Sequence, residues 1–175
     1  NVDSLSTPEL VRTGTMVFSE VTIEAWVYLD QNYVFDRNRV IFAGGWDGRL
    51  EVGIGANHKA YIMVYSDTIG TFQLSSDNEL NKFQWYHVAA VYSEQNDQMV
   101  LYINGKFDRS VSLPEQFELG RSATVENCIG AIAGCSAGNF IGLIDEVRIT
   151  NGLLYPEQFL YRPDRAYISA IVVDY

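Results

Sequence analysis

The sequence predicts an all-β domain built as a sandwich or barrel, and three observations support this fold class. Short segments rich in β-branched and aromatic residues recur at roughly 8–12-residue spacing, with glycine, asparagine and aspartate between them. No apolar stripe with the 3.6-residue period of a helix continues over about 12 positions. The chain has 175 residues, 47% of them hydrophobic, which is enough to bury the core of one domain.

The expected strands follow from alternating or continuous apolar runs. In residues 21–28 the odd-numbered side chains are apolar, so we expect them to face the core while Glu24 and its even-numbered neighbours face the other way. Asp47-Gly48 and Asn104-Gly105 are expected hairpin turns. At most a short helical turn is expected, at residues 8–11 or 156–159. The expected strands are residues 21–28, 40–43, 50–54, 60–65, 71–74, 86–92, 99–103, 110–113, 128–131 and 140–150.

The charge balance excludes two classes of partner. The chain carries 22 acidic and 12 basic side chains, a formal net charge of −10. Nucleic acid and anionic membrane surfaces both favour lysine and arginine, so we expect neither as a partner. No uninterrupted run of about 18 apolar residues is present, and we therefore expect no insertion into a membrane.

Three sequence blocks, in this order, identify a family resemblance. They are VTIEAWV at residues 21–27, WYHVAAVY with LYINGK between residues 85 and 106, and FIGLIDEVRITN at residues 140–151. Together they resemble the laminin-G-like jelly roll of the concanavalin-type lectin/glucanase superfamily, and its bacterial and phage members most of all. The resemblance implies a concanavalin A-like antiparallel jelly-roll sandwich of two sheets, one of them concave, over residues 1–163. Residues 164–175 would then form a separate β-prone tail.

No arrangement of residues predicts catalysis. The glucanases of this superfamily place two or three carboxylates on one face of a strand, at spacings such as Glu-x-Asp-x-x-Glu. Here Asp145 and Glu146 are adjacent, so they are expected to point to opposite faces. The G-x-S-x-G match at residues 134–138 lies between two strands rather than before a helix. His58 and His87 lack metal-ligand spacing, and we expect no enzyme activity.

The resemblance also implies a calcium site at an edge of the sandwich. Asp145 matches the family's ligand in the last strand, and the other oxygens would come from the segment around Asp3 and from the carbonyls of Gly44 and Gly45. The alternative is that backbone N–H groups alone satisfy Asp145. Alternation places Asp145 in an otherwise apolar row of this strand. If the first and last long strands pair, as the resemblance implies, Glu24 and Arg148 would be cross-strand partners, a surface pair worth about a few tenths of a kcal/mol.

Glycan binding requires exposed aromatic rings beside polar side chains, because sugars stack on rings and hydrogen-bond through their hydroxyls. The residues expected to line the concave face are Tyr33, Trp46, Asp47, Arg49, Tyr61 and Tyr65. The alternative is that these rings belong to the core or to an ordinary sheet surface, since 13% of the chain is aromatic. Both interpretations stay open at this point.

Two further expectations concern covalent and intermolecular contacts. Cys128 and Cys135 are expected to close a small disulfide loop, with two ordinary thiols as the alternative. The tail is expected to fill a sheet edge, either in its own subunit or in a neighbour through strand addition.

We therefore expect a non-catalytic binding or adhesion module that recognises a glycan or cell-surface polysaccharide. Its location would be extracellular, at a cell surface or on a virion. One alternative is a structural subunit of a filament, tail or capsid decoration without a small ligand. The other is an accessory domain of a polysaccharide-degrading enzyme. The fold alone does not choose among these functions.

Overall fold

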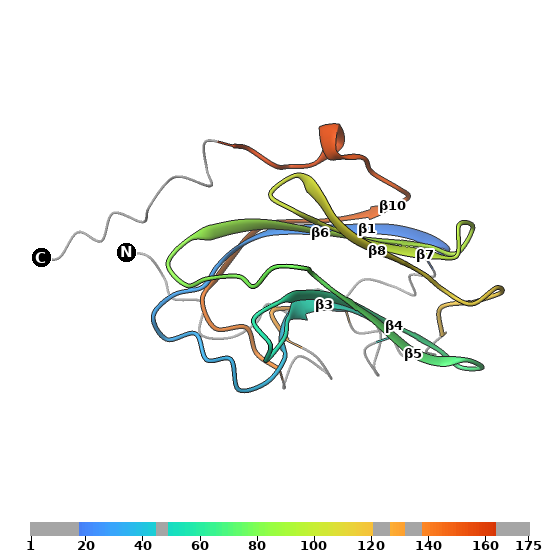
Figure 1. Cartoon of the computed structure of the whole chain (residues 1–175), viewed down its shortest axis with the longest axis horizontal. Helices are drawn as coiled ribbons and strands as arrows, with labels where there is room; N and C mark the ends of the chain where they lie inside the picture. The colour runs from blue at the N-terminus through green and yellow to red at the C-terminus, as the bar shows by residue number, and fades with distance from the viewer. Residues whose placement is uncertain (1–17, 45–48, 121–126, 132–137, 164–175) are drawn as a thin grey trace, which may run out of the picture.

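In a computed structural model, ten strands form two antiparallel sheets of five strands that face each other (Figure 1). The structure describes residues 18–44, 49–120, 127–131 and 138–163. Sheet A has the order β10-β1-β6-β7-β8, and sheet B has the order β5-β4-β3-β2-β9. The all-β, two-sheet jelly-roll prediction is confirmed. The strands are β1 (Glu20–Tyr28), β2 (Arg39–Gly44), β3 (Leu50–Ile54), β4 (Ala60–Ser66), β5 (Gly70–Ser75), β6 (Trp85–Ser93), β7 (Gln98–Ile103), β8 (Lys106–Ser112), β9 (Cys128–Ile129) and β10 (Leu143–Asn151).

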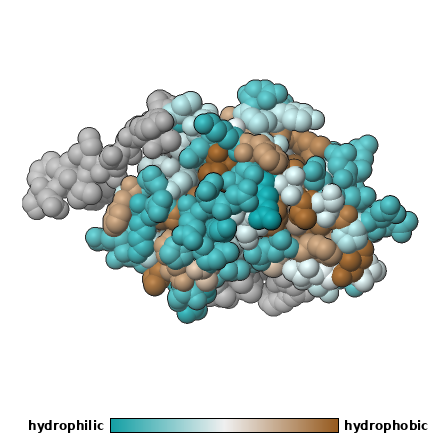
Figure 2. All heavy atoms as spheres, in the orientation of Figure 1, coloured by the Kyte–Doolittle hydropathy of each residue, from teal (hydrophilic) through white to brown (hydrophobic). Residues whose placement is uncertain are grey.

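The core lies between the sheets and follows the alternation seen in the sequence. Val21, Ile23, Ala25 and Val27 of β1 all belong to the core cluster and are at most 1% exposed. Sheet B contributes its own alternating residues from β3 and β4 to the same cluster. Burying each such aliphatic side chain stabilises the fold by about 1.5–3 kcal/mol. The face of the molecule seen in Figure 2 is mainly hydrophilic.

The strand β10 differs from its predicted pattern because a bulge interrupts it. Arg148 pairs with Glu24, but Asp145 pairs with Trp26, so β10 has one residue more than β1 between these pairs. Glu146 has a φ of 49° at this point. The extra residue reverses the alternation, because Ile144 and Val147 both pack against the core. The prediction that Asp145 lies in the apolar row was therefore wrong, and its side chain is exposed.

After β10 the chain turns back across the outer face of sheet A (Figure 1). We call residues 152–163 the strap; they include the 3-10 helix η1 (Pro156–Gln158), where the sequence predicts a short turn. The strap covers the outward row of β1, and Glu24 and Trp26 are at most 1% exposed. The Glu24–Arg148 pair exists as predicted, but the expectation of a surface pair was wrong because Glu24 is buried. Within the described residues no helix is both long and apolar enough to cross a membrane.

Candidate functional site

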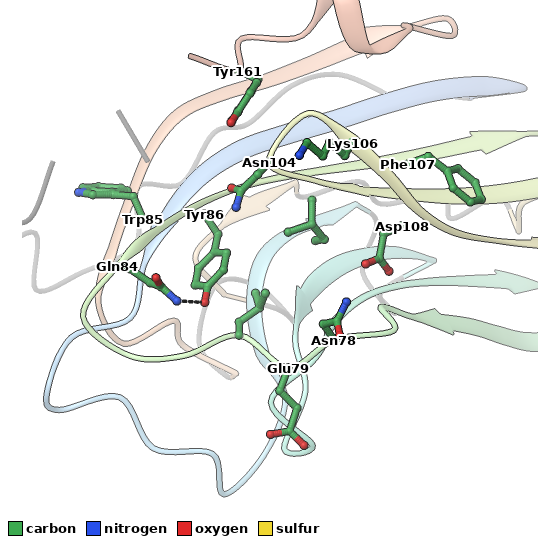
Figure 3. A pocket seen from close by; sticks show the side chains of 12 residues that line it. Asn78, Glu79, Gln84, Trp85, Tyr86, Asn104, Lys106, Phe107, Asp108 and Tyr161 are labelled. Carbon is green, nitrogen blue, oxygen red and sulfur yellow. Dashed lines mark hydrogen bonds between the residues drawn. The ribbon is translucent and has the colours of Figure 1, made fainter. Parts of the chain in front are cut away.

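The described residues form a pocket at the end of sheet A where β6 begins, with a volume of about 490 Å³. The connection between β5 and β6 supplies one wall, and the hairpin of β7 and β8 supplies another. Tyr161 of the strap closes the upper side, as Figure 3 shows. The lining residues are Asn78, Glu79, Leu80, Gln84, Trp85, Tyr86, Ile103, Asn104, Lys106, Phe107, Asp108 and Tyr161.

Asn104 is held rigidly by the turn that it begins. Asn104 and Gly105 have φ values of 51° and 69°, as the two central residues of a type I′ hairpin turn require. The Asn104 N–H donates to the His87 carbonyl at 2.8 Å, and the Asn104 Oδ1 accepts from the His87 N–H at 2.9 Å. With the carboxamide oxygen engaged, the Nδ2 group of the same side chain is a fixed hydrogen-bond donor at the pocket.

Two further polar groups of the pocket are fixed by hydrogen bonds. The Tyr86 hydroxyl accepts from the Asn81 N–H at 2.8 Å and from the Gln84 side-chain amide, and its ring is 8% exposed. The Asp108 Oδ2 accepts from the Asp77 N–H at 2.8 Å, which leaves the Oδ1 atom of this half-buried carboxylate as a further acceptor. The pocket therefore presents a fixed donor and a fixed acceptor without first ordering flexible side chains.

Aromatic residues complete the lining: the Tyr161 ring closes the upper side, while Trp85 and Phe107 lie at the rim with their rings directed away from the centre of the pocket in Figure 3. The Tyr161 ring stacks on Trp26, with a centroid distance of 5.8 Å and an interplanar angle of 17°. It also covers Gly105, because a Cβ atom added there would lie 2.5 Å from the Tyr161 ring. Trp85 packs against Tyr28 at the edge of the pocket, and Phe107 is 62% exposed. A sugar in the pocket could contact the Tyr161 ring while its hydroxyls reach the polar groups.

The pocket has more negative than positive side chains. Glu79 and Asp108 are carboxylates, and Lys106 is the one basic side chain in the lining. Asp77, next to the pocket, pairs with Arg109 at 3.3 Å, so its charge is largely balanced. An uncharged, hydroxyl-rich ligand fits this balance better than an anion does.

The residues predicted to bind glycan do not gather at this pocket. Tyr33 and Tyr61 are at most 1% exposed, so the prediction that they offer stacking surfaces was wrong. Arg49 lies 4.2 Å from the Tyr65 ring centroid and pairs with Asp67 at 2.7 Å, on the outer side of sheet B. Trp46 and Asp47 lie outside the described residues.

Tyr61 instead belongs to a buried polar pair on sheet B. Its hydroxyl donates to the Glu51 carboxylate, and Gly53 lies opposite it across the β3–β4 ladder. A Cβ atom at Gly53 would lie 2.8 Å from the Tyr61 oxygen, so only glycine leaves room for the ring. Burial raises the pKa of Glu51, and the hydrogen bond from Tyr61 opposes this shift only in part.

This raised pKa gives a testable pH dependence. Above pH 4.5, the ordinary value, the unfolded chain releases the Glu51 proton before the native chain does, so the native state loses stability as the pH rises. We expect Glu51→Gln, which keeps an acceptor for Tyr61, to gain about 1–3 kcal/mol over the wild type at pH 8 and little at pH 4. Urea unfolding at both pH values measures this, with the exposed Glu115→Gln as control. An equal effect at both pH values would contradict the expectation.

The predicted calcium ligands are placed only in part. Asp145 is exposed on β10, and its Oδ1 atom accepts the Glu146 N–H at 2.8 Å. Gly44 ends β2 in the other sheet, while Asp3 and Gly45 lie outside the described residues. Among the described residues no group of three histidine, cysteine, aspartate or glutamate side chains could hold a metal ion. A calcium ion held mainly by backbone carbonyls stays a prediction.

Cys128 begins β9, is 1% exposed and is disulfide-bonded. Cys135, the other cysteine of the chain, lies outside the described residues, and the Cys128–Cys135 loop stays a prediction.

Several pocket residues belong to conspicuous sequence motifs, but these motifs indicate the fold and not a binding site. Trp85 and Tyr86 open one of the blocks of the family resemblance, and Asn104-Gly105 closes it. Their meeting at one end of sheet A depends on the β6–β7 pairing, in which Val88 lies opposite Ile103. Tyr161 had no sequence signal, because the strap has no strand or helix periodicity.

The sequence matches a family model, Laminin_G_3, described as the concanavalin A-like lectin/glucanases superfamily, over residues 3–158. The comparison with curated proteins gives no match.

Several solved structures are similar to this chain. A candidate carbohydrate binding protein from Bacteroides ovatus is 22% identical with a TM-score of 0.66; the match covers 87% of this chain but only 42% of that one. The CBM40 of a Ruminococcus gnavus sialidase, bound to sialyllactose, is 14% identical with a TM-score of 0.65, covering 87% and 94% of the two chains. Domain 4 of AbnA, an extracellular arabinanase from Geobacillus stearothermophilus, in complex with arabinotriose, is 22% identical with a TM-score of 0.63, covering 86% and 69%. At these identities the similarity shows the fold.

Proposed function

The chain belongs to the concanavalin A-like lectin/glucanases superfamily, and from this premise we propose that it is a non-catalytic carbohydrate-binding module. The glycan would bind in the pocket lined by Asn104, Asp108 and Tyr161. The observation that carries the proposal is that a fixed donor, a fixed acceptor and the Tyr161 ring lie around one pocket. The sugar complexes of the similar sialidase and arabinanase domains support this class of ligand.

We expect the glycan to be neutral. The pocket has two carboxylates and one ammonium group, and the whole chain has a net charge of −10. A sialylated or uronic-acid ligand would bring a further carboxylate next to Glu79 and Asp108. Neutral sugars instead offer neighbouring hydroxyls, one of which can accept from Asn104 while the next donates to Asp108.

A module attached to a secreted polysaccharide-degrading enzyme is the second candidate role. The similar structures include a domain of an extracellular arabinanase and the CBM40 of a sialidase. In such a protein this chain would hold the enzyme on its polysaccharide, and the sugar-binding chemistry of the pocket would be the same. An adhesion module at a cell or virion surface would use the pocket in the same way.

The proposal is tested by calorimetric titration of the purified chain with arabinotriose, lactose, maltotriose and 3′-sialyllactose. We expect binding of at least one neutral sugar and none of the sialylated one. Asp108→Ala should weaken that binding about 10–100-fold, because a hydrogen bond to a charged group is lost. The control is Glu115→Ala, which removes an exposed carboxylate outside the pocket.

Two outcomes would contradict the proposal. Equal affinity of wild type and Asp108→Ala would place the sugar elsewhere on the chain. Failure of every sugar on a wider glycan array, neutral and acidic, would remove carbohydrate binding itself.

A further inference from the structure

The strap is held on sheet A by side chains of one strand. Thr22, Glu24 and Trp26 form the outward row of β1, and each binds the strap. The Thr22 hydroxyl donates to the Gly152 carbonyl at 2.9 Å and accepts from the Leu154 N–H at 3.0 Å. The Trp26 indole donates to the Leu160 carbonyl at 3.3 Å. The outward side chains of β1 therefore hold the strap near both of its ends, at residues 152–154 and at residue 160.

Glu24 is the centre of this attachment. Its Oε2 atom accepts from the Leu160 N–H at 2.8 Å and contacts the His87 Nε2 atom at 2.9 Å. Its other oxygen accepts from Arg148, whose Nη2 atom also donates to the Gln158 carbonyl at 2.6 Å. The Glu24 and His87 side chains are both 0% exposed. A single buried carboxylate therefore holds the strap directly at residue 160 and, through Arg148, at residue 158.

The residue that follows Leu160 enters the pocket. The Tyr161 ring stacks on Trp26 and lies over Gly105, while it forms the upper side of the pocket in Figure 3. The walls from β6, β7 and β8 are parts of sheet A, whereas this wall is carried only by the strap. The position of Tyr161 therefore depends on contacts made at Leu160, one residue away.

We propose that the strap is a latch that completes the pocket, and that Glu24 is a positioning residue which sets the place of Tyr161 without touching the ligand. This inference rests on the proposed function for its effect on sugar binding, but not for the latch itself. When the strap is released, the pocket loses its upper wall while the fixed donor and acceptor on sheet A stay in place.

A purely structural role for Glu24 makes a different prediction. If the network only stabilised the sandwich, its loss would not act through Tyr161, and the effects of changing the two residues on affinity would add. If Glu24 acts by placing Tyr161, then changing Glu24 should not weaken sugar binding further once the Tyr161 ring has been removed. A double-mutant cycle on sugar affinity separates the two roles.

The experiment uses Glu24→Gln, Tyr161→Ala and the double variant, well below their melting temperatures. Hydrogen exchange of the Leu160 amide reads strap docking without any sugar. Calorimetric titration measures the sugar affinity of the pocket, using whichever of arabinotriose, lactose or maltotriose the wild type binds. Glu20→Gln is the control, because Glu20 lies on the same strand but its carboxylate accepts from Ser93 rather than from the strap.

We expect Glu24→Gln to speed exchange of the Leu160 amide by about tenfold or more, with no change in Glu20→Gln. Tyr161→Ala should weaken sugar binding about 3–10-fold, and adding Glu24→Gln should cost no more than about twofold further. Unchanged exchange in Glu24→Gln, or fully additive losses of affinity, would overturn the inference. If the wild type binds no sugar, the proposed function fails, while the exchange result still decides the latch.

Discussion

Replacing Gly142 by alanine is expected to lower the free energy of unfolding by about 3–5 kcal/mol. Gly142 has a φ of 125°, a region that side-chain-bearing residues enter only at a cost of about 1–3 kcal/mol. A Cβ atom at this position would also lie 2.2 Å from the Tyr28 carbonyl oxygen, which is backbone and cannot rotate away. Relieving such overlap costs a further 1–3 kcal/mol, roughly, in a packed structure.

Gly152 provides a matched control for this prediction. Its φ is 137°, so alanine meets a comparable conformational cost, but no atom lies within 4 Å of the added Cβ. We expect Gly152→Ala to lose only about 1–3 kcal/mol. Urea unfolding of both variants at pH 7 measures the two losses. Equal losses would mean that the contact with Tyr28 relaxes freely and that the close approach of β1 to the start of β10 is not a constraint.

The second large effect is expected for Glu24→Gln. Removing one member of a buried ion pair is commonly worth about 3–5 kcal/mol, because the partners stay buried without their counter-charge. Arg148 is 33% exposed and can turn toward water, so we expect a loss of about 2–4 kcal/mol at pH 7. This loss concerns the whole sandwich and is measured by chemical denaturation.

The loss should depend on pH in a defined direction. Burial alone would raise the pKa of Glu24, but the hydrogen bonds from His87, the Leu160 N–H and Arg148 together lower it below the ordinary value of 4.5. A lowered carboxyl pKa stabilises the native state above about pH 4.5, and the benefit disappears as the pH falls through the native value. Wild type and Glu24→Gln should therefore converge in stability as the pH falls further and further below 4.5.

Glu51→Gln is the internal comparison for this pH dependence. Both variants neutralise a buried glutamate, yet burial raises the pKa of Glu51 and polar partners lower that of Glu24. Raising the pH from 4 to 8 should therefore favour Glu51→Gln and disfavour Glu24→Gln relative to the wild type. A loss in Glu24→Gln that stays constant across this range would show that its carboxylate charge is not what stabilises the fold.

Local pattern predicted the sheets well and the outer contacts poorly. The alternation of β1 correctly places Val21, Ile23, Ala25 and Val27 toward the core, because successive side chains of a strand point to opposite faces. In β10 the same rule holds for Val147 but fails before the bulge, since an extra residue at Glu146 exchanges the two faces there. No alternation rule marks a bulge in advance, so Asp145 was assigned to the wrong side.

The pocket and the buried network could not be predicted for a different reason. Glu24 accepts from the N–H of Leu160, 136 positions away. The strap that buries Glu24 has no strand or helix periodicity from which its course could be predicted. The pocket needs Asn78, Asn104 and Tyr161 from three separate segments. Their types were visible in the sequence, but their proximity is a property of the assembled sheets. Tyr33 and Tyr61 lie on or beside predicted loops and hairpins, where exposed rings are expected, but the assembled sheets bury both residues.

The position of β1 between β6 and β10 has a consequence for how the chain folds during synthesis. β1 leaves the ribosome well before β10, one of its two neighbours in the sheet, which lies more than 100 positions further along, and Thr22 bonds to Gly152 across 130 positions. Such non-local pairing is associated with folding in milliseconds to seconds. Until β10 and the strap emerge, β1 has an open edge with its apolar row on one face. The nascent chain is therefore exposed to aggregation through this edge until β10 is made.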